Sequence, residues 1–121
     1  MMKGKYRYFD WRDWERCTPR CSEIQMNDRF LKMLDKARHK AGIPFIINSA
    51  YRNVAWEKAM GRTGTSSHTK GVAVDIKCNC SYDRLIIVKA LLDVGFKRIG
   101  IYDSFIHVDN DDSKIDCLFL S

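Results

Sequence analysis

The sequence predicts an α+β domain with a small, mainly antiparallel sheet and flanking helices. Two long segments, 28–41 and 81–94, repeat apolar residues at the spacing of three to four that is typical of a helix. Residues 72–77 instead place Val, Val and Ile at every second position, which indicates a strand. In order, the expected elements are helix, strand, helix, strand, helix, strand and strand, an order typical of helices packed on an antiparallel sheet.

The chain begins with residues 1–27, which are rich in aromatic and charged residues without clear periodicity. We expect them to form an irregular N-terminal arm that packs across the domain. Asn27 can then cap the first long helix by accepting a hydrogen bond from its first turn. That helix should end near Ala41, because Gly42 and Pro44 are typical of helix ends.

The later elements follow from the same patterns. Ser81 can cap the second long helix, and Gly95 can end it. The remaining expected elements are a buried strand at 44–49, a short helix at 53–60, a loop of small residues at 61–71, and strands at 97–102, 104–109 and, at the sheet edge, 115–120.

Length and composition indicate one small domain. The chain has 121 residues, and no linker or internal repeat divides residues 1–121. No apolar run approaches the ~20 residues that cross a bilayer, and the N-terminus lacks the apolar stretch of a secretory signal. We therefore expect a monomer made in the cytoplasm, with no membrane span. A net charge of +6 suits an anionic cell envelope or a nucleic acid, and is equally found on basic proteins without such partners.

Five cysteines cannot all pair within one chain, because their number is odd. In a reducing compartment, free thiols are the default. The spacing of Cys17 with Cys21 and of Cys78 with Cys80 also permits a thiolate metal site or a disulfide.

Two of the three histidines lie in unusual settings. His39 falls on the charged face of the first helix, where a solvated side chain is expected. His68 lies in the loop of small residues, seven positions before Asp75 of the predicted strand, and His107 lies inside another predicted strand. If the two strands are neighbours, His68, Asp75 and His107 converge. Two imidazoles and one carboxylate with an open fourth position are typical of a catalytic zinc site.

The sequence around His68 matches a known pattern. Residues 66–75, Ser-Ser-His-Thr-Lys-Gly-Val-Ala-Val-Asp, fit Ser-x-His-x-x-Gly-x-Ala-x-Asp. This motif resembles that of the zinc D-Ala-D-Ala carboxypeptidases and the related dipeptidases and phage endolysin peptidases. Ser-Ala-Tyr-Arg at 49–52 and the run from Gly95 to Asp109 are also similar to this family, so that the resemblance covers about residues 28–110. It implies a Hedgehog/DD-peptidase-like fold.

Carried over by position, the resemblance implies a Zn²⁺ ion bound by His68, Asp75 and His107. Arg52 would hold the substrate and stabilise the oxyanion, a role suited to its fixed planar charge. Without the resemblance, Arg52 would be interpreted as a surface arginine at a strand end. Ser66 would either bind substrate or fix the loop.

The sequence departs from the family at the general base. Many relatives place a carboxylate three residues before the last histidine, where this chain has Ser104. Serine cannot accept a proton as a carboxylate does. Two candidate replacements are Asp109, which follows His107 by two positions and shares its strand face, and Asp103, four positions before it. Short members of the family resemble this chain in carrying His-x-Asp, so the resemblance favours Asp109.

The sequence thus predicts a zinc metallopeptidase that hydrolyses a peptidoglycan stem-peptide bond involving a D-amino acid. Without a signal peptide, such an enzyme would act on the cell wall after release, as a phage or prophage lysis protein does on its host. Ser104 keeps open a non-catalytic zinc-binding module. A basic nucleic-acid-binding protein is a third hypothesis, although no recognised nucleic-acid motif is present.

Overall fold

The structure is a computed structural model that describes residues 5–121, so residues 1–4 of the expected arm lie outside the described part. The helices are α1 (Trp11–Glu15), α2 (Asp28–Ala41), α3 (Val54–Ala59) and α4 (Ser81–Asp93), and the 3₁₀ turns are η1 (Glu23–Gln25) and η2 (Ser67–Lys70). The strands are β1 (Ile47–Ser49), β2 (Ala73–Lys77), β3 (Arg98–Ile101), β4 (Phe105–Asp109) and β5 (Cys117–Leu120).

The five strands form one mixed sheet in the order β1-β2-β4-β3-β5. The pairs β1–β2, β2–β4 and β4–β3 are antiparallel, whereas β5 lies parallel to β3 at the edge. The predicted α+β class, the mainly antiparallel sheet and the final edge strand are therefore confirmed.

The first long helix has the limits that its capping residues predict. The Asn27 side chain accepts a hydrogen bond from the Phe30 amide at 2.9 Å, and Gly42 ends α2 with a φ of 69°. The prediction for α4 was wrong by one residue. Cys80 is its N-cap, with Sγ accepting from the Asp83 amide, and Ser81 is already helical.

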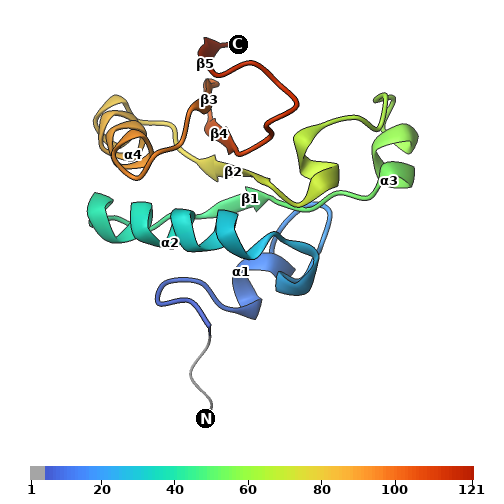
Figure 1. The fold of residues 1–121 in the computed structure, drawn as a ribbon, viewed down its shortest axis with the longest axis horizontal. Coiled ribbons are helices and arrows are strands. Elements are labelled where there is room, and N and C mark those ends of the chain that lie inside the picture. Colours follow the sequence, from blue (N-terminus) through green and yellow to red (C-terminus); the bar gives the residue numbers. More distant parts are fainter. Residues whose placement is uncertain (1–4) are drawn as a thin grey trace.

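Helices α2 and α4 lie together on one face of the sheet, and α3 lies away from them (Figure 1). Their apolar sides share a core with Val74, Ile76, Ile106 and Val108 of the two central strands. Because side chains alternate along a strand, the residues between these project from the opposite face. That opposite face carries Asp75 and His107.

The N-terminal segment is less irregular than expected. Within residues 5–27 the chain forms α1 and η1, and the Asp10 side chain caps α1 by accepting from the Arg12 amide. Trp14 is fully buried in the core beside Phe9, with ring centroids 5.6 Å apart. The first strand is shorter than expected, because regular pairing with β2 begins only at Ile47.

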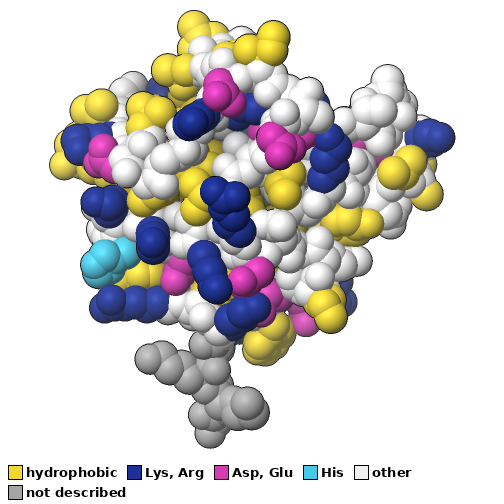
Figure 2. Space-filling model, in the orientation of Figure 1, with side chains coloured by type: hydrophobic (Ala, Val, Ile, Leu, Met, Phe, Trp, Pro, Cys, Tyr) yellow, Lys and Arg dark blue, Asp and Glu magenta, His cyan; other side chains and the backbone are white. Residues whose placement is uncertain are grey.

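The surface is rich in basic side chains, which Figure 2 shows gathered over α2. The exposed basic residues of that helix recur at helical spacing and are Arg29, Lys32, Lys36 and Lys40. Among the helices of residues 5–121, none combines the length and the apolar character that crossing a bilayer requires.

Candidate metal centre

The three predicted ligands come together on the face of the sheet opposite α2 and α4. Asp75 of β2 and His107 of β4 are direct partners across the antiparallel pair, so that their side chains share a face. His68 lies in η2, which leads into β2 through Gly71. One ligand atom from each of the three residues lies within 4.8 Å of the others.

Asp75 contacts both imidazoles. Its Oδ1 is 3.0 Å from Nδ1 of His107 and 3.3 Å from Nε2 of His68. His68 and Asp75 are buried, and the His107 side chain is 13% exposed. The centre is therefore largely shielded from solvent, and His107 is its most exposed ligand.

Hydrogen bonds behind the ligands orient both imidazoles. Nδ1 of His68 lies 2.7 Å from the Ala50 carbonyl oxygen, which can only accept, so Nδ1 carries the proton and the Nε2 lone pair faces the site. Nε2 of His107 lies 2.7 Å from Oδ2 of Asp109, which leaves Nδ1 facing the site. Such outer partners are typical of histidines that bind metals. The donor set and its tautomers fit a zinc ion.

The electrostatics of the centre favour a positive charge between these groups. Burial raises the pKa of Asp75, but hydrogen bonds from His107 and His68 outweigh burial and hold that pKa well below its ordinary range. Burial lowers the pKa of His107, but the bonds to Asp109 and Asp75 outweigh it and raise that pKa. Either a proton or a metal ion can supply the charge that the carboxylates attract.

Arg52 contacts the centre, and each of its three guanidinium nitrogens has a partner within the protein. Nη2 donates to Oδ2 of Asp75 at 3.1 Å, Nη1 pairs with Glu57 at 3.3 Å, and Nε donates to Ser49 at 2.9 Å. The Arg52 side chain is only 12% exposed. Arg52 therefore holds the free oxygen of Asp75 and fixes the direction of that ligand.

Sequence reasoning missed Glu57 of α3, which is fully buried. Its Oε2 accepts from Ser66 at 2.7 Å and from Arg52, so Ser66 contacts Glu57 in this structure and fixes the loop. Burial raises the pKa of Glu57, but the bonds from Ser66 and Arg52 outweigh burial and lower it. No sequence signal separates this glutamate from an exposed one on a short helix.

A family model described as Peptidase M15 matches residues 9–109 of the chain. The chain belongs to the M15 peptidase family. This confirms the zinc D-Ala-D-Ala carboxypeptidase-like family that the motif at residues 66–75 resembles, and makes the chain a peptidase by family. The comparison with curated proteins found no match.

The two carboxylates predicted as candidates for the base of this M15 peptidase lie in different settings. Asp109 is buried, and besides His107 it contacts Nε of Arg98 at 2.9 Å. Asp103 and Ser104 are exposed in the turn between β3 and β4, where the Asp103 carbonyl accepts from Arg84 of α4. The structure brings Asp109 to the far nitrogen of His107 and leaves Asp103 at the hairpin tip.

Proposed function

We propose that this M15 peptidase binds zinc through His68, Asp75 and His107 and hydrolyses a peptidoglycan stem-peptide bond involving a D-amino acid. The observation that carries the proposal is the convergence of Nε2 of His68, Oδ1 of Asp75 and Nδ1 of His107, each held by a second partner. The family supports hydrolysis of a peptide, and the D-amino acid is the expectation that the motif carries.

The bound zinc would polarise the scissile carbonyl and lower the pKa of a water molecule, which is what amide hydrolysis requires. The chain's own residues supply the positioning. Arg52 keeps Asp75 directed at the site, and its positive charge also stabilises negative charge that develops beside it. Ser66 and Glu57 hold Arg52 and the loop that carries His68.

We assign different roles to the two candidate bases because their contacts differ. Asp109 is engaged by His107 and Arg98, so we assign it the orientation of His107. The Asp103 carboxylate has no hydrogen-bond or ion-pair partner among residues 5–121, and we propose it as the proton acceptor. An enzyme of this kind would act as a monomer on a cell wall after release from the cell that makes it, as a phage lysis protein does.

A zinc-binding module without hydrolysis is the second candidate. Two features favour it: Ser104 stands where the resemblance implies a carboxylate in many relatives, and Asp109 already contacts His107 and Arg98. Both candidates require the same three ligands, so activity and metal content must be measured together.

The test combines elemental analysis with hydrolysis of purified peptidoglycan, for the wild type, His68→Ala and His39→Ala. His39 lies on α2, away from the metal centre, and serves as the matched control. We expect about one zinc per chain and release of wall peptides for the wild type and the control, both lost in His68→Ala. Zinc without hydrolysis would favour the binding module, and absence of zinc from the reconstituted wild type would refute both candidates.

A further inference from the structure

The last segment of the chain, residues 110–121, lies beyond the part that the family model matches and returns to the metal centre. Asp111 anchors it to η2, because the buried Asp111 carboxylate accepts from Oγ of Ser67 at 2.8 Å. Lys114 follows three residues later, and its Nζ is 3.1 Å from the same Ser67 oxygen. Since Ser67 directly precedes the ligand His68, this segment places an ammonium group at the edge of the centre.

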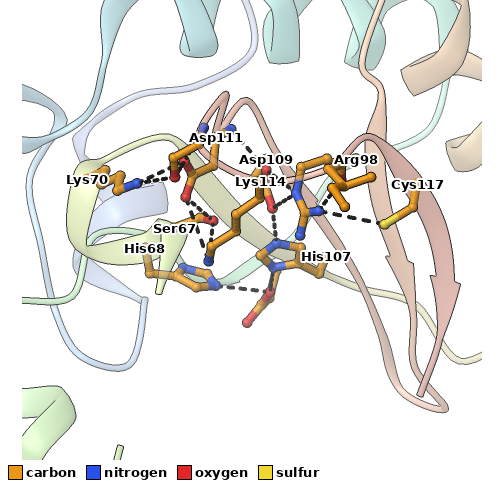
Figure 3. Close-up of polar contacts among 12 residues, drawn as sticks. Ser67, His68, Lys70, Arg98, His107, Asp109, Asp111, Lys114 and Cys117 are labelled. Atoms are coloured by element: carbon orange, nitrogen blue, oxygen red, sulfur yellow. Dashed lines mark hydrogen bonds and ion pairs between the residues drawn. The ribbon is translucent and has the colours of Figure 1, made fainter. Parts of the chain in front are cut away.

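Figure 3 shows where the Lys114 side chain points. It runs from the 110–116 loop toward the His68 and His107 rings, while Lys70 extends to the far side of Asp111. The two lysines thus share one carboxylate, at 2.9 Å for Lys70 and 3.7 Å for Lys114. Two cations with one shared anion leave excess positive charge, and the Lys114 side chain is the one directed at the histidines.

The Lys114 side chain is more accessible to a ligand than that of Arg52. An ammonium group has three donors, and the contacts of Lys114 are the Ser67 hydroxyl and the longer approach to Asp111. Its side chain is 36% exposed, so an incoming ligand can reach it. Arg52, by contrast, is only 12% exposed, and each of its three nitrogens already contacts Ser49, Glu57 or Asp75.

We propose that the Lys114 ammonium binds a carboxylate of the peptide substrate beside the scissile bond, an inference that rests on the proposed function. The carboxylate is either the C-terminal group of the stem peptide or an acidic group within it. An ammonium recognises both by a charge-assisted hydrogen bond. Lys114 is thereby a specificity-determining residue supplied by the end of the chain.

The test uses a synthetic stem pentapeptide ending in D-Ala-D-Ala, as the free acid and as its C-terminal amide. Zinc-loaded wild type, Lys114→Met, Lys114→Arg and the control Lys70→Met are compared by steady-state hydrolysis, and the binding of both peptides is measured by calorimetry with and without zinc. We expect Lys114→Met to raise KM and Kd for the acid about tenfold or more, with a much smaller change in kcat. Lys114→Arg should restore most of the affinity, and Lys70→Met should behave as the wild type.

The two peptides separate the two carboxylates. A defect of Lys114→Met confined to the acid assigns Lys114 to the C-terminal carboxylate, and an equal defect on both peptides assigns it to an internal one. Unchanged KM and Kd for both peptides in Lys114→Met would overturn the inference while leaving the peptidase intact. If the wild type binds the peptides through Lys114 but does not hydrolyse them, the proposed peptidase activity is refuted and the proposed carboxylate site is supported. Absence of binding and of hydrolysis in the wild type would overturn both.

Discussion

Among single residues, Asp109 decides how firmly His107 is held. Its Oδ2 is 2.7 Å from Nε2 of His107, so Asp109→Asn replaces a charged acceptor by a neutral amide. Loss of such a partner typically lowers metal affinity about 10–100-fold. We expect that decrease in a competitive zinc titration with a chromophoric chelator. Asp103→Asn should retain wild-type zinc affinity and lose hydrolysis, and equal zinc affinity in both variants would contradict the division of roles.

Of the residues around the metal centre, Glu57 is the one whose removal should lower the free energy of unfolding most. It is fully buried against Arg52, whereas the ion pair of Glu15 with Arg20 lies on the surface. Removing one member of a buried pair leaves an uncompensated charge, which costs about 3–5 kcal/mol, and a surface pair contributes about 1 kcal/mol at most. Urea unfolding should therefore show a large decrease in the free energy of unfolding for Glu57→Ala and a small decrease for Glu15→Ala. Similar losses would mean that Arg52 has sufficient partners in Ser49 and Asp75.

At the scale of elements, η2 depends on a close approach that only glycine permits. Gly71 ends η2 with a φ of 71°, and a Cβ there would lie 2.4 Å from the Gln25 carbonyl oxygen. Gly42 has a similar φ of 69° with no atom within 4 Å of an added Cβ. Gly42→Ala should cost about 1–2 kcal/mol from the left-handed backbone alone. Gly71→Ala should lower the stability measured by thermal unfolding more than Gly42→Ala does, and it should also weaken zinc binding. Equal losses of stability would show that the backbone at Gln25 shifts to make room for the added Cβ.

The contact between η2 and the 110–116 loop should make stability depend on pH. Burial raises the pKa of Asp111, but hydrogen bonds from Ser113, Lys70 and Ser67 outweigh it and hold the pKa below its ordinary 3.8. A lowered folded pKa stabilises the fold above the unfolded pKa, and this contribution is lost as pH falls through the folded value. Asp111→Asn should thus lower the unfolding free energy by about 1–3 kcal/mol at pH 7, with the difference narrowing below pH 4. Urea unfolding of the wild type and Asp111→Asn at several pH values would measure this difference. The control is Asp112→Asn, because Asp112 is exposed.

Elements with local signals were predictable, and contacts that depend on tertiary packing were not. The limits of α2 follow from Asn27 and Gly42, whose capping roles act within one turn. The convergence of His68, Asp75 and His107 followed from a motif and from strands that are neighbours. The burial of Glu57 and the return of Lys114 to η2 depend instead on how distant segments pack, and neither periodicity nor capping carries that information.

At the scale of the whole molecule, the basic residues of α2 and the metal centre lie on different sides of the sheet. The basic residues of α2 lie on the helix layer (Figures 1 and 2), whereas Asp75 and His107 project from the opposite face of the sheet. An anionic wall polymer bound along α2 would leave the centre accessible. We expect the protein to sediment with purified cell walls at 0.1 M salt and to be released near 1 M, because the screening length falls from about 10 Å to about 3 Å.

The position of the charges, and not only their sum, should decide this adhesion. Lys36→Glu with Lys40→Glu reverses two charges of the α2 row, and Lys58→Glu with Lys77→Glu makes the same change in net charge on α3 and β2. We expect the α2 pair to lose wall binding at 0.1 M salt and to hydrolyse a soluble stem peptide at the wild-type rate. The second pair should retain most of the binding. Equal losses in both pairs would show that the net charge of +6 acts as a whole, without a preferred face.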